Sequence, residues 1–500
     1  MIISDEAAPY PRQHERVARL FGLAAALAGS LAAWWYVRAG LTLSHYDAKA
    51  HLVVARRILD SLTPGWKQIG AVWLPLPHLL NLLPTQVEVF YRTGAFAVAL
   101  SVACFGLLCY ACARMVLDAT GSRAATLAGL SVVVINPDLL YLQATPMTEP
   151  LLLALVTISI SMLTRWVSTD GRSGAAAPGM ALAAACLTRY EAWPVTAMAL
   201  SLAVLALWRR GSTFGQAVWA VARLAVFPAA ALLAFLVQSK LTVGHWFVTG
   251  GFYVPDNPDT GRPFKTIGSI WWASHHLNGY GVLLCAAAGA VVVLVTGLRD
   301  RARAASLVTL ALVGSAAVPW YAFYSGHPFR FRYMIPLVPA LAVWAGIAVG
   351  RAGRFRVAAA AALLILVLVE TRPLDPAAPM VVEAQLDRQH SRERRVVADY
   401  LQTHRRGEKM LASLGSLSHF VQELSSIGVR IRDVVHEGNG DLWAAALQHP
   451  SAHVGWVLVE ELSEGGDVLA AASREKPGFL DGFSRVAEGG GVALYERTAK

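Results

Sequence analysis

The chain has 500 residues, of which 55% are hydrophobic and only 15% are charged, and its formal net charge is +10. This composition excludes an ordinary soluble domain and is typical of a polytopic α-helical membrane protein. No basic module interleaved with aromatic residues is visible, so the positive charge does not predict nucleic-acid binding. All five cysteines lie in apolar segments, which argues against a disulfide framework or a thiolate metal site.

Apolar runs of about twenty residues recur along the chain and predict about eleven membrane-spanning helices. They cover residues 19–38, 93–116, 122–136, 147–166, 175–189, 192–208, 217–241, 279–298, 304–323, 333–350 and 355–371. The first run follows a long polar leader with several arginines, which favours an uncleaved signal anchor over a cleaved signal peptide.

Arginines gather in alternate short loops and predict the orientation in the membrane, because positively charged loops stay in the cytoplasm. These residues are Arg123, Arg165, Arg172, Arg209, Arg210, Arg299, Arg301, Arg303, Arg351, Arg354 and Arg356. We therefore expect a multi-pass protein of the plasma (inner) membrane with a cytoplasmic N-terminus. The outer, periplasmic face then receives residues 44–88, 136–149, 189–191, 242–278 and 324–332, and everything after Glu370.

The first outer segment is too long to be a simple connection between two spans. It begins with a charged stretch on a helix-forming backbone, residues 44–60, which Thr63-Pro64-Gly65 ends. A second piece, residues 73–81, is aromatic, rich in proline and amphipathic, as expected of a segment that lies flat on a membrane. The pattern predicts two interfacial helices and a site built at the membrane surface.

After residue 381 the chain alternates amphipathic helical pieces with short apolar runs, which predicts a small α/β domain. The helical pieces are residues 385–406, 417–426, 441–448 and 468–473, and the strand-like runs are residues 409–413, 429–435, 455–459 and 492–496. We therefore expect two domains: a membrane domain over residues 1–372 and a soluble outer domain over residues 373–500.

Three carboxylates fall on the predicted outer face: Asp47, Glu149 and Glu191. Ionisable groups at a membrane boundary are costly and tend to be functional, and carboxylates among basic residues suit general-base work. Each has a plainer alternative. Asp47 and Glu149 could cap helix N-termini, and Glu191 could form a local ion pair with Arg189.

Basic residues also lie near this outer face, against the positive-inside trend. They include Lys49, Arg189, Arg330 and Arg332. The sharpest case is His327-Pro-Phe-Arg-Phe-Arg-Tyr333, where two arginines flank a phenylalanine at the mouth of a span. Such arginines suit a lipid-linked phosphate, because guanidinium groups match phosphate oxygens. The alternative is that they only anchor the chain at the interface.

Several segments resemble the GT-C superfamily of glycosyltransferases that use polyprenyl-phosphate sugars. The first is Tyr46-Asp-Ala-Lys-Ala-His-Leu-Val-Val-Ala-Arg-Arg57, followed by Val72-Trp-Leu-Pro-Leu-Pro-His78. The others are Met147-Thr-Glu-Pro-Leu151, Thr188-Arg-Tyr-Glu-Ala-Trp193 and Arg332-Tyr-Met-Ile-Pro-Leu-Val-Pro-Ala-Leu341. They are most similar to the branch of protein O-mannosyltransferases and aminoarabinose transferases (glycosyltransferase family 39-like). The resemblance covers about residues 15–370.

The resemblance implies an enzyme that transfers a hexosyl or pentosyl group, with inversion, to an acceptor hydroxyl on a glycan, lipid or protein. It makes Asp47 the general base and has arginines hold the phosphate of the donor. From their place on the predicted outer face, Glu149 and Glu191 are further candidate catalytic carboxylates. The candidate phosphate ligands are Arg330, Arg332, Arg189 and Lys49, and the candidates for positioning the acceptor are His51, Tyr190 and His327. The resemblance assigns no metal ligand and no fixed cofactor, although a role for a divalent metal stays open.

One feature departs from the strictest form of the family pattern, and one absence bears on metal dependence. Many members carry an acidic residue beside the first-loop aspartate, where this chain has Ala48, and the loop contains no Asp-x-Asp pair. The second absence disfavours the metal-dependent oligosaccharyltransferase variant. The rival functions are a secondary transporter or lipid flippase, for which no internal repeat is visible, and a non-catalytic assembly factor.

Overall fold

The computed structural model describes residues 12–246, 257–462 and 465–498. It divides into two compact units. The helical unit comprises Met1–Trp35, Leu100–Ala144 and Thr148–Val381. The sheet-containing unit comprises Tyr36–Ala99, Thr145–Met147 and Val382–Lys500. The predicted domain boundary at residues 372 and 373 stays a prediction, but the first outer segment groups with the C-terminal tail.

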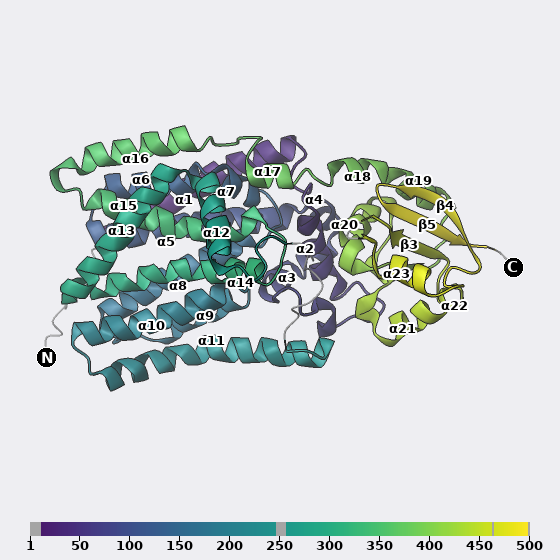
Figure 1. The fold of residues 1–500 in the computed structure, drawn as a ribbon, viewed down its shortest axis with the longest axis horizontal. Helices are drawn as coiled ribbons and strands as arrows, with labels where there is room; N and C mark the ends of the chain where they lie inside the picture. The colour runs from purple at the N-terminus through teal and green to yellow at the C-terminus, as the bar shows by residue number, and fades with distance from the viewer. Residues whose placement is uncertain (1–11, 247–256, 463–464, 499–500) are drawn as a thin grey trace. The chain divides into compact units, whose positions relative to one another are not determined.

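Long apolar helices make up most of the helical unit (Figure 1). Among the described residues, eight helical stretches are long and apolar enough to cross a membrane. They are α1 (Arg12–Arg38), α5 (Ala95–Thr120), α8 (Glu149–Ser168), α10 (Ala192–Arg210), α11 (Phe214–Val243), α13 (Tyr280–Arg299), Arg301–Tyr324 and Phe331–Gly350. The last two each join a 3-10 helix to an α-helix: η3 (Arg301–Ala316) with α14 (Ala317–Tyr324), and η4 (Phe331–Leu337) with α15 (Val338–Gly350).

The remaining predicted spans correspond to shorter helices. These are α6 (Arg123–Val134), α9 (Ala176–Cys186) and α16 (Arg356–Glu370). The other described elements of this unit are α7 (Pro137–Leu142), α12 (Pro263–Asn278) and η5 (Gly353–Phe355), and α17 (Pro379–Glu383) leads into the next unit. The prediction of a polytopic helical membrane protein is confirmed.

Glycines bring α15 close to two neighbouring helices. A Cβ atom at Gly289 of α13 would lie 1.9 Å from the backbone oxygen of Trp344. At Gly129 of α6 it would lie 2.6 Å from the backbone oxygen of Ala342. Small residues at such contacts let helix backbones approach closely, which is how helices associate in lipid.

A five-stranded sheet forms the centre of the other unit, with strand order β2-β1-β3-β5-β4. The strands are β1 (Met410–Leu411), β2 (Val434–Val435), β3 (Trp456–Glu460), β4 (Phe483–Gly489) and β5 (Val492–Arg497). β1 pairs in parallel with β2 and β3, whereas β5 is antiparallel to β3 and β4. Four of these strands coincide with predicted runs, and β4 was not predicted.

Helices from both ends of the sequence surround this sheet. The first outer segment contributes α2 (Tyr46–Arg57), η1 (Trp66–Ile69), α3 (Leu76–Asn81), η2 (Pro84–Gln86) and α4 (Glu88–Thr93). The tail contributes α18 (Arg388–Glu393), α19 (Arg395–His404), α20 (Leu414–Leu424), η6 (Ser425–Ile427), η7 (Ile431–Asp433), η8 (Glu437–Asn439), α21 (Asp441–Gln448), α22 (Pro450–His453) and α23 (Val468–Glu475). α19 lies beside β4 (Figure 1).

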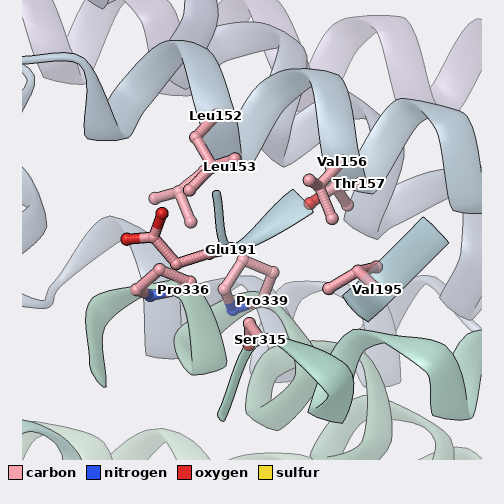
Figure 2. A pocket seen from close by; sticks show the side chains of 9 residues that line it. All are labelled: Leu152, Leu153, Val156, Thr157, Glu191, Val195, Ser315, Pro336 and Pro339. Carbon is pink, nitrogen blue, oxygen red and sulfur yellow. The ribbon is translucent and has the colours of Figure 1, made fainter. Parts of the chain in front are cut away.

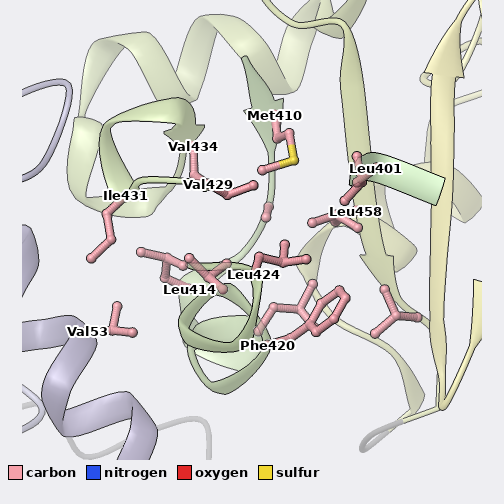
Figure 3. Close-up of a cluster of buried hydrophobic side chains, with 14 of the residues drawn as sticks. Val53, Leu401, Met410, Leu414, Phe420, Leu424, Val429, Ile431, Val434 and Leu458 are labelled. Atoms are coloured by element: carbon pink, nitrogen blue, oxygen red, sulfur yellow. The ribbon is translucent and has the colours of Figure 1, made fainter. Parts of the chain in front are cut away.

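One hydrophobic core joins the two sets of helices (Figure 3). Leu52 and Val53 of α2 share it with Phe420 of α20, Ile431 of η7 and Leu458 of β3. The first outer segment is therefore part of the folded α/β unit and not a separate surface loop.

Candidate active site

Asp47 lies in the first turn of α2, in the sheet-containing unit. The N-cap of this helix is His45, whose Nδ1 accepts a hydrogen bond of 3.1 Å from the Asp47 backbone N–H. Asp47 itself is only 8% exposed. Because another residue fills the N-cap position, the alternative in which Asp47 caps this helix is wrong.

A histidine pair lies one turn further along α2. His51 Nδ1 is 3.1 Å from His78 Nε2, and His78 Nδ1 donates to the Leu74 carbonyl at 3.0 Å. Burial lowers the pKa of His78 to about 3, so its ring is neutral and its Nε2 accepts. The proton of this contact therefore lies on His51, and the Trp73 ring packs at a tilt of 41° against the His51 ring, with centroids 4.1 Å apart. The arrangement fixes the orientation and tautomer of His51.

Lys49, predicted to bind phosphate, has a protein partner in the structure. Its ammonium forms an ion pair with the Glu423 carboxylate of α20, and the lysine is 7% exposed. Arg56, further along α2, pairs with Asp60 at 2.9 Å and with Glu88. Lys49 and Arg56 of α2 thus have carboxylate partners in their own unit.

In the helical unit, Arg189 lies between two carboxylates. Its Nη1 is 3.0 Å from Glu149 Oε1, and its Nη2 is 2.7 Å from Glu191 Oε1. The same Nη1 donates to the Thr148 hydroxyl at 3.1 Å. Glu149 is fully buried and Glu191 is 3% exposed. Two buried carboxylates share one guanidinium, so each depends on Arg189 for its charge balance.

This cluster decides two of the open alternatives. Thr148 is the N-cap of α8, and no side chain caps that helix, so Glu149 makes an ion pair and is not a capping residue. The local pair between Arg189 and Glu191 is present, as the plainer interpretation expected. The neighbouring Tyr190 packs edge-on against Trp193 and Phe235, with centroids 5.1 Å and 6.2 Å away.

A small cavity lies beside Glu191 (Figure 2). It measures about 10 Å³, is lined mainly by apolar side chains of α8 and α10, and includes Pro336 and Pro339. The buried Thr157 hydroxyl at its edge has no hydrogen-bond partner among the described residues. The volume suits one water molecule and is far too small for a sugar.

The predicted arginine motif spans the loop before η4 and its first turn. His327 Nε2 is 3.3 Å from the Tyr333 hydroxyl, and the Arg332 guanidinium carbon is 5.6 Å from the Tyr333 ring centroid. Phe329 and Phe331 pack against Trp272 of α12, with centroids 5.6 Å and 5.2 Å away. The aromatic residues thus anchor the loop, and half-buried Arg330 and Arg332 alternate with them along it.

The predicted site residues fall into two groups. The sheet-containing unit holds Asp47, Lys49 and His51, whereas the helical unit holds Glu149, Arg189, Tyr190, Glu191, His327, Arg330 and Arg332. Across the described ranges, no three His, Cys, Asp or Glu side chains gather as a metal site would require.

The comparisons with known proteins identify the fold of the chain through a solved structure, and not through its sequence. No protein-family model and no curated protein matches the sequence. Among solved structures, the crystal structure of ArnT from Cupriavidus metallidurans bound to undecaprenyl phosphate is similar, with a TM-score of 0.54. The chain has a GT-C fold. The match covers 96% of this chain and 98% of that chain at 14% identity, so it extends over both units.

Sequence reasoning missed the partners that hold these residues. His45, Glu383 and Glu423 were not singled out, yet His45 caps α2, Glu423 holds Lys49, and Glu383 Oε1 lies 3.6 Å from His45 Nε2. Only His45 carried a local signal, since it directly precedes the helix. The two glutamates lie more than 300 positions away, and no local pattern links them to α2.

Proposed function

We propose that the protein is a membrane glycosyltransferase that moves a sugar from a polyprenyl-phosphate donor to an acceptor hydroxyl on the outer face. The observation that carries this proposal is the GT-C fold, shared over nearly the whole chain with an ArnT structure that is bound to undecaprenyl phosphate. A lipid-linked donor also suits the outer face, because nucleotide sugars would be absent there. Residues for proton transfer and for phosphate binding are both present in the chain.

Asp47 is the proposed general base. The acceptor oxygen attacks the anomeric carbon while the bond from that carbon to the phosphate oxygen breaks, and the acceptor proton passes to the Asp47 carboxylate. The attack comes from the side opposite the leaving group, so the configuration inverts. Polyprenyl phosphate leaves with the bonding electron pair, and His51 is proposed to position the acceptor.

Arg330 and Arg332 are the proposed phosphate ligands. Arg332 is placed by its contact with Tyr333, and Arg330 is half-buried two positions before it. Arginine in such a position offers a planar fork that matches phosphate oxygens. Glu149 and Glu191 already hold Arg189, so their proposed role is to orient this guanidinium, and any contact of Arg189 with phosphate is shared with them. Tyr190 and His327 are kept as acceptor-side candidates.

The test is transfer by the purified protein. Lipids that copurify in detergent are identified by mass spectrometry, and polyprenyl-phosphate sugars that match them are offered with glycan, lipid and protein acceptors. We expect release of free polyprenyl phosphate together with a glycosylated product. Movement of an intact lipid-linked sugar from one leaflet of a proteoliposome membrane to the other, without cleavage, would instead identify a flippase. The absence of both transfer and this movement would favour an assembly factor.

A further inference from the structure

The helix that carries Asp47 is built into the core of the C-terminal α/β fold. Every residue of α2 from Asp47 to Arg56 is buried. Figure 3 shows Val53 on this helix facing Ile431 and Leu414, which come from the tail. The position of α2 therefore depends on side chains contributed by the tail.

A polar network in the tail fixes the partner of Lys49. The Glu423 oxygen that meets the Lys49 ammonium also accepts a hydrogen bond of 2.9 Å from the Ser391 hydroxyl. Arg394 lies 3.8 Å from the same oxygen and is itself held by Asp387 at 3.0 Å and 2.5 Å. Ser391 and Arg394 thus hold the Glu423 carboxylate in the orientation in which it contacts Lys49 of α2.

Lys49 points to a different side of α2 from Asp47. The two residues are two positions apart, and side chains with that spacing do not face each other on a helix. The structure directs Lys49 to α20. A phosphate bound at Lys49 would have to displace Glu423 and would lie on the wrong side of the helix for a reaction at Asp47.

We propose that Glu423 is a positioning residue, which fixes the orientation of α2, and with it Asp47, through its ion pair with Lys49. In this role Lys49 is not a donor ligand, and the α/β tail is needed for the geometry of the reaction. The inference rests on the proposed function, in which Asp47 is the base.

The test uses the full-length protein with three variants: Glu423→Gln, Lys49→Met and the double variant. Glu423→Gln leaves a buried ammonium without its counter-charge, whereas removal of both charges is much better tolerated. Since a displacement of about 1 Å in an active site costs about a hundredfold, we expect Glu423→Gln to lower kcat by about ten- to a hundredfold with an unchanged donor KM. The double variant should recover most of this loss.

A direct role of Lys49 in donor binding gives a different pattern. Lys49→Met and the double variant would then share a raised donor KM, and no recovery would occur, which would overturn the proposal. Normal kcat in Glu423→Gln would overturn it as well. If Glu423→Gln fails to fold, Glu423→Asp replaces it, because it keeps the charge but withdraws the carboxylate, and a partial kcat loss is expected.

Hydrogen exchange of the α2 backbone amides separates this inference from the proposed function. We expect faster exchange over Tyr46–Arg57 in Glu423→Gln and a return toward wild-type exchange in the double variant. If the wild type transfers no sugar, the proposed function fails, and the exchange comparison alone decides the coupling. Unchanged exchange would refute it. Glu461→Gln is the control, because Glu461 pairs with Arg485 at 2.9 Å in the same unit and, among the described residues, forms no ion pair with α2.

Discussion

The substitution Asp47→Asn separates catalysis from helix stability. In the structure the N-cap of α2 is His45, and Asp47 places a negative charge in the first turn of the helix. Such a charge stabilises a helix by about 0.3–1 kcal/mol. Asparagine keeps the shape and loses the charge, so the free energy of unfolding should fall by no more than about 1 kcal/mol.

The expected effect on turnover is much larger. Loss of a general base lowers the rate by about a hundred- to ten-thousandfold, which equals about 2.7–5.4 kcal/mol of transition-state stabilisation. The rate of polyprenyl phosphate release at saturating donor and acceptor measures kcat, and thermal unfolding in the same detergent measures stability. Donor affinity should stay within about threefold, because the base acts on the acceptor proton.

Glu88→Gln is the matched control. Glu88 lies in the first turn of α4, in the same outer segment, and pairs with Arg56. The variant, like Asp47→Asn, loses a carboxylate charge near a helix N-terminus, but Glu88 has no role in the proposed reaction. We expect near-normal kcat in this variant, because the Arg56 guanidinium of α2 keeps its ion pair with Asp60. Near-normal turnover in Asp47→Asn, or an equal loss in both variants, would refute Asp47 as the base and make Glu149 or Glu191 the next candidate.

Four further predictions test other parts of the structure. Arg332→Ala should raise the donor KM about ten- to hundredfold, since a hydrogen bond to a charged group is worth about 1.5–3 kcal/mol, and Arg332→Lys should restore only part of this; an unchanged donor KM in both would return Arg332 to interfacial anchoring. Arg189→Met removes the shared partner of two buried carboxylates, so thermal denaturation should show a loss of about 3–5 kcal/mol, and a loss below about 1 kcal/mol would contradict a structural role for this cluster. Burial lowers the pKa of His436 from 6.5 to about 3, so the folded state loses stability as the pH falls from 6.5 toward 3; His436→Asn should remove about 2 kcal/mol of the stability difference between pH 7 and pH 5, with the exposed His453→Gln as control. A reporter fused after Arg172 should be cytoplasmic and one fused after Glu383 should lie outside; a cytoplasmic C-terminus would reverse the predicted orientation.

The spans and most of the tail could be predicted because their signals are local. Apolar runs of membrane length need no partner to be recognised, and the helix predicted over residues 441–448 is observed as α21, Asp441–Gln448. β4 was missed because its side chains are largely exposed or half-buried, so it contains no apolar run. The pair Gly490-Gly491 carried a usable signal. Both residues have positive φ, as the two-residue hairpin turn between β4 and β5 requires.

The candidate site was predictable only in part. The pair of Arg189 and Glu191 could be inferred because the residues are two positions apart. The contact of Arg189 with Glu149 could not, since it depends on how α8 packs beside the loop before α10. The partner of Lys49 is 374 positions away. A lysine such as Lys49 on a buried helix needs an acidic partner. The sequence does not indicate which segment supplies that partner.

The shared core of α2 and the tail also constrains how the chain matures during synthesis. Lys49 leaves the ribosome 374 residues before Glu423. At about 5–20 residues per second, that gap lasts roughly 20–75 s. During this interval α2 has neither its counter-charge nor the apolar surface that buries Leu52 and Val53. Until the tail is synthesised, α2 therefore lacks its packing partners. A nascent chain that stops before the tail would carry Asp47 on a helix without the core and the ion pair that hold it.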